Sequence, residues 1–253
     1  MGGAMKISFC TTCKGRAHHL KETLPKNLED NKGHPQIEFV LLDYNSPDDL
    51  SSWVRQNLSI EISNGRVIYY QETTAAFFDP RHAKNIAHLL GTGDVLVNLD
   101  ADNFTGPGYA GGLADAFVCP NAFVTSVDER KKYGEWFGLS GRIALKRKDF
   151  LRLRGYDESQ VGWGGEDLDL IRRAQHSGLK RIPLLWPGES VIRHSDSERL
   201  RYFKIKAPRT VTNAVNLSVS TKHPDRPINS LGYGLGVVYK NFENVPQEVG
   251  IRS

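Results

Sequence analysis

The stretch GWGGEDLD, residues 162–169, has residue types and spacing that could do chemistry. It places a tryptophan among three glycines, directly before Glu166, Asp167 and Asp169. Acids at a helix start are favoured by the helix dipole, but the dipole explains neither the tryptophan nor the glycines. Glycines let a backbone bend, a tryptophan on such a hinge can cover a bound ligand, and a carboxylate beneath it can act as a general base.

A second acidic motif follows the apolar run DVLVNL and reads Asp100-Ala101-Asp102-Asn103. Two carboxylates at the end of a buried strand suit a hard divalent cation that also binds substrate phosphates. The alternative is a turn in which an aspartate caps the next segment. His194, in VIRHS, could complete a mixed oxygen and nitrogen ligand set, which favours Mn²⁺ over Mg²⁺, or it could be structural.

The first half of the chain alternates short apolar runs with helical patterns. The expected strands are Lys6–Thr11, Ile37–Leu42, Val67–Tyr70 and Asp94–Leu99, and the expected helices are His18–Leu28 (interrupted by Pro25), one starting at Ser46-Pro47, and Pro80–Leu90. This alternation predicts an α/β fold with a Rossmann-like, mostly parallel central sheet flanked by helices. Ligands bind such a sheet beyond the carboxyl ends of its strands, where the acidic motif lies.

The pattern is looser after residue 105. We expect helices over Gly108–Phe117, Arg147–Leu153 and Glu166–His176, and strands over Ser140–Leu145 and Ser190–Arg193. No element is predicted beyond about Ser197. The glycines of GYGLG, at positions 232, 234 and 236, follow no clear strand and open no clear helix, so we give them no phosphate-binding role.

Composition limits the class of protein. The net charge is +4, which is too weak to argue for nucleic acid but compatible with an anionic small substrate or with loose attraction to an acidic membrane surface. No apolar run approaches the roughly 18 residues of a transmembrane segment, and MGGAMKISFC lacks the apolar stretch of a secretion signal. Three cysteines, an odd number, argue against a disulfide framework and favour a reducing cytoplasm, with Cys10 and Cys13 as ordinary buried residues.

Several stretches resemble known glycosyltransferases. GWGGEDLDL followed by VIRHS resembles the β-1,4-galactosyltransferase family, as do FGLSGRIALKRKDFLRLRGYDE at 137–158 and ISFCTTCKGRAHHL near the start. LLDYNSPDD and PRHAKNIAHLLGTGDVLVNLDADNF are similar to the wider family 2 pattern of the GT-A fold. The resemblance covers roughly residues 6–200. It implies a nucleotide-sugar-binding half over 5–105, an acceptor and catalytic half over 106–200, and a C-terminal extension over 201–253.

The resemblance also implies roles for individual residues. Asp102 and His194, with Asp100, match the metal ligands; Asp167 matches the catalytic base and Glu166 the donor-sugar contact. Trp163, Gly164 and Gly165 match the closing loop that meets donor and acceptor, with Asp169 beside it. The positions implied for donor binding are Thr11, Arg16, Asp43, Arg81, Lys84, Asp100 and Gly141. TTCKGR lacks the Pro-Phe of the family's first loop, and Val191 stands where members can carry methionine.

The activity implied is an inverting, metal-dependent transfer from a nucleotide diphosphosugar to an acceptor hydroxyl in glycan or polysaccharide synthesis. The expected donor is a UDP-sugar of the galactose or N-acetylgalactosamine type, and the expected cofactor is Mn²⁺ or Mg²⁺. Without a membrane anchor or luminal disulfides, a bacterial-type cytoplasmic enzyme is expected. The alternatives are a sugar nucleotidyltransferase and a glycan- or nucleotide-binding protein without turnover. The basic stretch Arg199, Arg201, Tyr202, Lys204 and Lys206 could contact a diphosphate, but a solvated edge is preferred.

Overall fold

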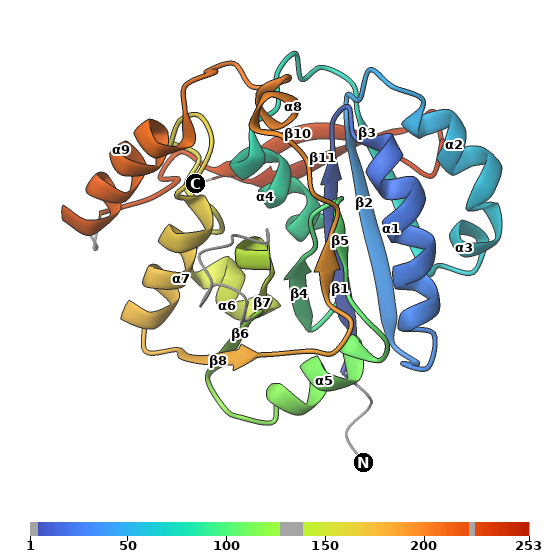
Figure 1. The fold of residues 1–253 in the computed structure, drawn as a ribbon, viewed down its shortest axis with the longest axis horizontal. Helices are drawn as coiled ribbons and strands as arrows, with labels where there is room; N and C mark the ends of the chain where they lie inside the picture. The colour runs from blue at the N-terminus through green and yellow to red at the C-terminus, as the bar shows by residue number, and fades with distance from the viewer. Residues whose placement is uncertain (1–4, 127–138, 223–225, 253) are drawn as a thin grey trace.

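The computed structural model describes residues 5–126, 139–222 and 226–252, so residues 1–4 and the start of the 137–158 stretch lie outside it. The described chain forms a nine-stranded sheet in the order β11-β10-β3-β2-β1-β4-β7-β6-β8, with helices on both sides (Figure 1). The four strands of the first half are β1 (Ile7–Cys13), β2 (Ile37–Tyr44), β3 (Val67–Glu72) and β4 (Val95–Asn98). All of them pair in parallel, as the alternation predicts.

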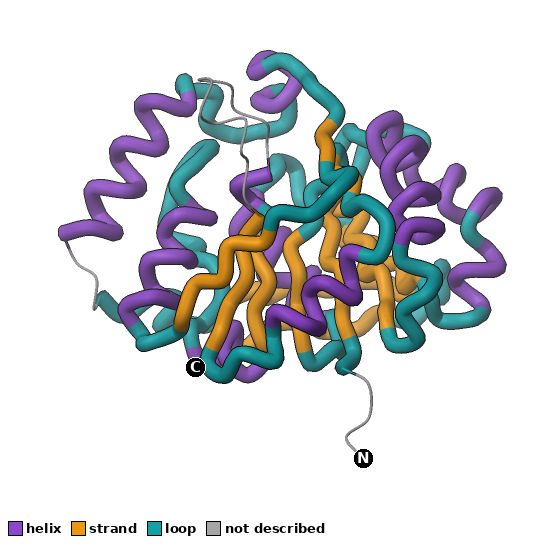
Figure 2. Tube along the Cα trace, turned by 60° about the horizontal axis from the view of Figure 1, so that its bottom comes forward, coloured by secondary structure: helices purple, strands orange, loops and turns teal. Residues whose placement is uncertain are grey.

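Alternation of side chains along the central strands builds a core on each face of the sheet. Phe9, Phe39 and Leu41 belong to one buried cluster, whereas Cys10 and Val40 belong to the other. Helices α1 (Ala17–Asp30), α2 (Leu50–Asn57) and α5 (Tyr109–Ala116) cover the first cluster; α4 (Pro80–Leu90), α6 (Arg147–Arg152) and α7 (Glu166–His176) cover the second. Figure 2 shows the strands as a layer between the helices. The predicted α/β fold with a mostly parallel central sheet is confirmed.

Two local predictions in the first half are wrong. Pro25 lies inside α1 rather than interrupting it, because the buried residues Leu24 before it and Asn27 after it hold the helix in place across one lost backbone bond. The helix expected from Ser46 begins instead at Leu50 and is followed by α3 (Ser59–Ser63). The Ser46 hydroxyl accepts a hydrogen bond from the Gly15 amide at 2.6 Å and so supports the loop after β1.

The second half extends the same sheet. Antiparallel β7 (Ile143–Lys146) pairs with β4 and with β6 (Ala122–Ser126), and β8 (Lys180–Leu184) pairs in parallel with β6. A 3-10 turn at Leu139–Gly141 leads into β7. Two short strands, β5 (Asn103–Phe104) and β9 (Ser190–Val191), form a separate antiparallel pair above the main sheet.

The C-terminal segment is integrated into the fold. It contains α8 (Asp196–Leu200), α9 (Arg209–Lys222), β10 (Tyr233–Lys240) and β11 (Pro246–Ile251). Strand β10 pairs antiparallel with β3, so the segment predicted as an extension forms one edge of the main sheet. Gly232 directly precedes β10, and Gly234 and Gly236 lie within it. None of the helices in the described parts of the chain is long and apolar enough to cross a membrane.

Candidate active site

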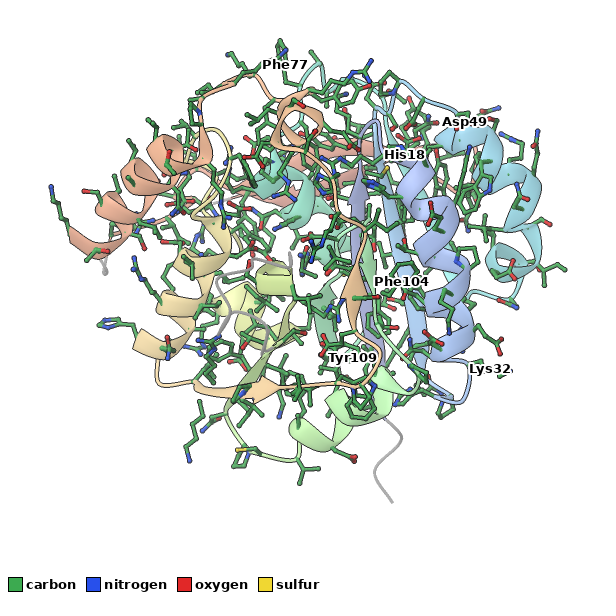
Figure 3. The ribbon with its side chains drawn as sticks, viewed as in Figure 1. His18, Lys32, Asp49, Phe77, Phe104 and Tyr109 are labelled. Atoms are coloured by element: carbon green, nitrogen blue, oxygen red, sulfur yellow. The ribbon has the colours of Figure 1, made fainter. Side chains whose placement is uncertain are left out.

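The short β5–β9 pair brings together two residues that lie far apart in the sequence. Its register sets Asn103 opposite Val191, and the Ile192 amide donates to the Asp102 carbonyl at 2.8 Å. As a result, Asp102 Oδ2 lies 2.7 Å from His194 Nε2, at the carboxyl edge of β4. The two predicted metal ligands are therefore neighbours. Figure 3 labels His18, which lies at the N-terminal end of α1 on this same side of the sheet.

The groups that surround His194 Nε2 suit a bound cation at this nitrogen better than a bound proton. Arg16 Nη1 lies 2.9 Å and Arg199 Nη2 lies 3.0 Å from this nitrogen, in addition to Asp102 Oδ2. One ring nitrogen cannot accept from guanidinium groups and also donate to a carboxylate. Burial opposes ionisation of Asp102, but the hydrogen bond and charge of His194 hold its pKa below the usual range. An ionised carboxylate and an imidazole suit Mn²⁺, with Mg²⁺ as the more oxygen-loving alternative.

A second group of possible ligands lies behind this pair. His18, His19 and Glu198 place ligand atoms within 4.8 Å of one another, and the His19 ring packs 5.2 Å from the His194 ring. Burial, with the charges of His18 and Arg16, lowers the pKa of His19 to about 4. The positive charge of Arg16 acts on both His19 and Glu198, which disfavours another cation there. Neutral His19 instead supports the His194 ring without adding positive charge.

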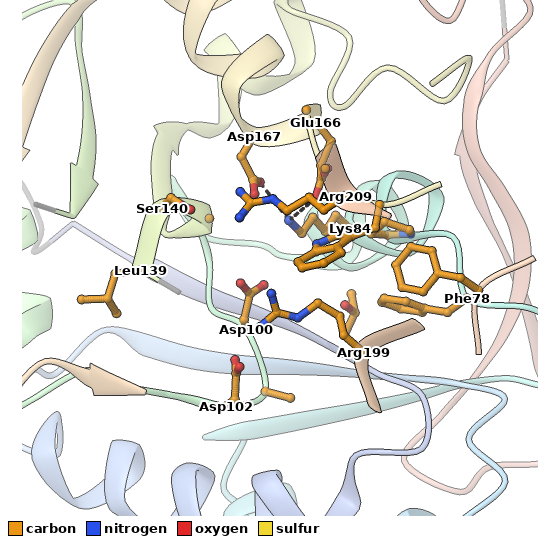
Figure 4. Close-up of a pocket in the computed structure, with 18 of the residues that line it drawn as sticks. Phe78, Lys84, Asp100, Asp102, Leu139, Ser140, Glu166, Asp167, Arg199 and Arg209 are labelled. Carbon is orange, nitrogen blue, oxygen red and sulfur yellow. Dashed lines mark hydrogen bonds and ion pairs between the residues drawn. The ribbon is translucent and has the colours of Figure 1, made fainter. Parts of the chain in front are cut away.

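An acidic pair faces this site from the first turn of α7. Lys84, on α4, donates from Nζ to Asp167 Oδ1 at 2.8 Å and lies 3.5 Å from Glu166 Oε1 (Figure 4). Burial raises the pKa of Asp167 to about 7, and the Glu166 and Asp100 carboxylates add to this while Lys84 opposes it. Burial acts on Glu166 too, but Lys84 and Arg81 hold the pKa of Glu166 below its ordinary value. The two adjacent carboxylates thus differ in proton affinity. The raised pKa of Asp167 suits a general base, and the lowered pKa of Glu166 suits a ligand contact that stays charged.

Two features leave room for a ligand between the acids. Glu166 is 5% exposed, yet its Oε2 has no hydrogen-bond partner within the described residues. A Cβ on Gly141 would lie 2.9 Å from Asp100 Oδ2 and 3.1 Å from Asp167 Oδ2. A side chain at position 141 would displace at least one of these carboxylates. The bare backbone at position 141 therefore lets both motifs face one space.

The loop before α7 is held from outside by α9. Asn216 Nδ2 donates to the Val161 and Gly164 carbonyls at 2.9 and 2.7 Å, and Thr212 Oγ1 donates to the Trp163 carbonyl at 2.5 Å. Gly165 has φ +96°, a conformation that side-chain-bearing residues rarely adopt. The guanidinium groups of Arg199 and Arg209 lie over the Trp163 ring, 4.4 and 5.1 Å from its centroid.

A cavity of about 570 Å³ joins these groups. The predicted residues that line it are Arg16, Lys84, Asp100, Asp102, Gly141, Trp163, Gly164, Gly165, Glu166, Asp167 and His194. Residues of the loop after β1 and of α4, α7 and α9 form its walls. The metal-ligand pair and the acidic pair thus open into the same space, which is large enough for a nucleotide sugar.

Four predicted site residues lie outside the cavity lining, and their contacts are structural. The Asp43 carboxylate accepts from Tyr69 Oη at 2.6 Å, and Thr11 is buried in β1. Arg81 Nη1 donates to the Gly162 carbonyl at 2.5 Å, so it anchors the tryptophan loop rather than facing a donor. Asp169 is fully buried and accepts from Arg173 and Ser220 at 2.7 and 2.6 Å, which ties α7 to α9 instead of presenting a carboxylate to an acceptor.

The structure adds cavity residues that were not among the predicted site residues. Arg199 and Tyr202 line the cavity, so the preference for a solvated edge is wrong for them, although Arg201, Lys204 and Lys206 are exposed. Arg209 and Asn213 reach the cavity from α9. The basic and aromatic composition of the stretch after His194 pointed to Arg199 and Tyr202, whereas nothing in the sequence singled out Arg209 and Asn213.

Solved structures with similar folds are glycosyltransferases. A mannosyltransferase from Pyrobaculum calidifontis, in complex with GDP-Man and Mn²⁺, matches with a TM-score of 0.61 and 18% identity, over 86% of this chain and 75% of that one. GalNAc-T7 with UDP, GalNAc and Mn²⁺ matches with a TM-score of 0.59 and 16% identity, over 76% of this chain and 44% of that one. The fold is that of a GT-A glycosyltransferase.

The second half is similar in sequence to galactosyltransferases. A family model described as the N-terminal domain of galactosyltransferase matches residues 120–207. Human β-1,4-galactosyltransferase 2 is 30% identical over 122 residues, which is 47% of this chain and 29% of the relative's length. The chain therefore spans less than a third of the curated relative that it matches. The chain thus has the GT-A fold, and its second half is similar in sequence to galactosyltransferases.

Proposed function

We propose that the protein transfers a sugar, with inversion, from a nucleotide diphosphosugar to an acceptor hydroxyl in a metal-dependent reaction. The observation that carries the proposal is one cavity with a metal-ligand pair, Asp102 and His194, on one side and an acidic pair, Glu166 and Asp167, on the other. The first pair suits the diphosphate end of a donor. The second suits the sugar and the incoming hydroxyl.

Asp102 and His194 would hold the cation, with Asp100 on the donor side. A divalent cation bound there would offset negative charge on the departing diphosphate. Arg16 and Arg199 already point guanidinium groups at this position, so both can turn to diphosphate oxygens when the cation replaces them at His194. Arg199 is the clearest addition to the residues predicted for donor binding.

Asp167 is the proposed general base. Its carboxylate takes the proton from the acceptor hydroxyl as the hydroxyl oxygen bonds to the anomeric carbon, and the bond from that carbon to the diphosphate breaks on the opposite face. Such proton transfer contributes about 10²–10⁴-fold in rate. The free Oε2 of Glu166 is placed to accept from a sugar hydroxyl. Trp163 covers the cavity and limits the access of water as a competing acceptor.

A UDP-sugar of the galactose or N-acetylgalactosamine type is the proposed donor, and Mn²⁺ the proposed metal. The match to a galactosyltransferase and the likeness to the structure of GalNAc-T7 with UDP, GalNAc and Mn²⁺ support this choice. A glycan hydroxyl is the proposed acceptor. A reducing, cytoplasmic location is also proposed, since Cys10, Cys13 and Cys119 are all unpaired.

Product analysis tests this function against its alternatives. Purified protein is incubated with Mn²⁺, a panel of UDP-sugars and sugar acceptors, and the release of UDP is measured. We expect acceptor-dependent UDP release that Asp167→Asn abolishes. Pyrophosphate release from UTP and a sugar phosphate would instead indicate a nucleotidyltransferase, although Lys14, in the loop after β1, already uses its Nζ on the Tyr44, Asn45 and Ala75 carbonyls. Binding of UDP without turnover of any donor would indicate a binding protein.

A further inference from the structure

Helix α9 turns its polar side inward and its apolar side outward. Thr212, Asn216 and Ser220, four residues apart, are 3%, 2% and 3% exposed. Val211, Val215 and Val219, also four residues apart, are 54%, 51% and 43% exposed. A surface helix of a globular protein normally shows the opposite arrangement. The valine stripe therefore needs an explanation outside the packing of this chain.

Hydrogen bonds to the tryptophan loop and to α7 hold the polar face of α9 inward. Thr212 and Asn216 hold the backbone of the tryptophan loop, and Ser220 donates to Asp169 at 2.6 Å. These bonds set the rotation of α9 about its axis. The helix cannot turn its valines inward without releasing the loop, so the stripe remains available for a partner. In Figure 1, α9 lies at the periphery of the molecule, next to α7.

The charges of the segment that leads into α9, and of the last turn of α9, indicate what the partner is. Residues 199–222 contain six lysines and arginines and no acidic residue. Arg201, Lys204, Lys206 and Lys222 are exposed, and Ile205 between two of these lysines is 40% exposed. Exposed apolar side chains flanked by basic ones are typical of helices that lie in the interface of an anionic bilayer. Each lysine or arginine near such a surface contributes favourably to binding.

A second copy of this chain fits the stripe less well. A two-fold contact through α9 would bring the basic segments of both copies together with no acid in 199–222 to pair with them. We propose that the surface formed by Val211, Val215, Val219, Ile205 and the four exposed basic residues docks the protein on an anionic lipid bilayer. Arg209 and Asn213 of the same helix line the cavity, so docking would bring the site close to the membrane surface. The inference rests on α9 and not on the proposed function.

Vesicle flotation tests the docking directly. Wild-type protein is floated with phosphatidylcholine vesicles, with and without phosphatidylserine, at low and high salt. We expect binding to the anionic vesicles only, weakened by salt. The variant Val211→Ser/Val215→Ser/Val219→Ser should lose about tenfold or more of this binding, because the apolar contact is removed. The matched control Val118→Ser/Val245→Ser changes valines that are 81% and 63% exposed elsewhere, and should bind as wild type does.

The variants are first compared with wild type by thermal melting, so that loss of fold is not read as loss of docking. Lys204→Glu/Lys206→Glu provides a second route, since it leaves α9 intact and should also abolish binding. No binding of wild type to anionic vesicles would overturn the proposal. So would binding that survives both sets of changes, or a concentration-dependent dimer that the valine changes disrupt in the absence of lipid.

Discussion

Lys84 and Asp167 form a buried ion pair, with Lys84 Nζ 2.8 Å from Asp167 Oδ1. The lysine side chain is 6% exposed and comes from α4, whereas the aspartate side chain is 19% exposed and lies in the first turn of α7. Lys84, predicted to face the donor, lines the cavity and contacts the acidic pair. It is therefore a positioning residue for the proposed base, and it opposes the effect of burial on the Asp167 pKa.

The pH dependence of transfer follows from this pair. Asp167 can accept a proton only when ionised, so activity should fall as the pH drops below about 7. Lys84→Met removes the charge that lowers the Asp167 pKa and should move this acid limb to higher pH. The activity that Lys84→Met loses near neutral pH should return in part at high pH, where Asp167 is ionised again. Lys148→Met, on the exposed side of α6, is the matched control, and an acid limb that Lys84→Met leaves in place would show that Asp167 is not the titrating base.

Arg199 should contribute to donor affinity. It lies 3.0 Å from His194 Nε2 and stacks on Trp163, so we expect it to contact the diphosphate. Charged hydrogen bonds contribute about 1.5–3 kcal/mol. Arg199→Ala should thus weaken UDP binding in the presence of Mn²⁺ by about tenfold or more, as measured by titration calorimetry. Arg201→Ala, two residues away and exposed, should leave the affinity unchanged; equal losses in the two variants would mean that only general positive charge matters.

Asn216 should couple α9 to catalysis. Its side chain makes three hydrogen bonds to the loop, to Val161 N, Val161 O and Gly164 O. Asn216→Ala leaves buried backbone groups unpaired, at a cost of about 1–3 kcal/mol in unfolding free energy. We also expect slower transfer, because Trp163 is held less firmly. Denaturant melts and kinetics measure both effects, with Ser218→Ala on the same helix as the control; wild-type kinetics in a destabilised Asn216→Ala would limit α9 to a structural role.

His88 should make the fold sensitive to acid. It is 2% exposed, stacks on Phe150 at 4.8 Å, and burial lowers its pKa to about 3. The unfolded chain protonates this histidine below about pH 6.5 while the folded chain does not. The unfolding free energy is therefore unaffected above pH 6.5 and falls by up to about 1.4 kcal/mol per pH unit as the pH drops toward 3. In His88→Gln this part of the slope should vanish, and an unchanged slope in melts between pH 4 and 7 would refute the assignment.

Elements with strong end signals could be predicted from the sequence. Helix α4 begins at Pro80 after Asp79, whose carboxylate accepts from the Arg81 amide, and ends before Gly91, as expected. Helix α7 has the predicted bounds for a similar reason, since glycines precede it and acids fill its first turn. Strand β8 was missed because KRIPL has only two apolar core-facing side chains, Ile182 and Leu184, and carries Pro183 between them. Strand β10 was missed because its glycines weaken the strand pattern.

The site was predictable only in part. Asp100, Asp102, Glu166 and Asp167 stand in recognisable motifs, so their types and neighbours were available in the sequence. The contact of Asp102 with His194 depends on two strands of two residues each, which carry no periodic signal. The inward polar face of α9 could not be predicted either. Its polar residues are buried because they bind the tryptophan loop, and the hydrophobic pattern of the helix alone would place its valines inward.

Thermal melting with UDP, with and without Mn²⁺, on wild type and Asp102→Asn is the most direct test of the nucleotide–metal site. A ligand at 100 times its dissociation constant adds about 2.7 kcal/mol to stability, which a melting shift reveals. We predict a shift in wild type that requires Mn²⁺ and is lost in Asp102→Asn. A shift of equal size in the variant, or none in wild type with UDP or any other nucleotide, would contradict the assignment of Asp102 and His194 and with it the proposed transfer.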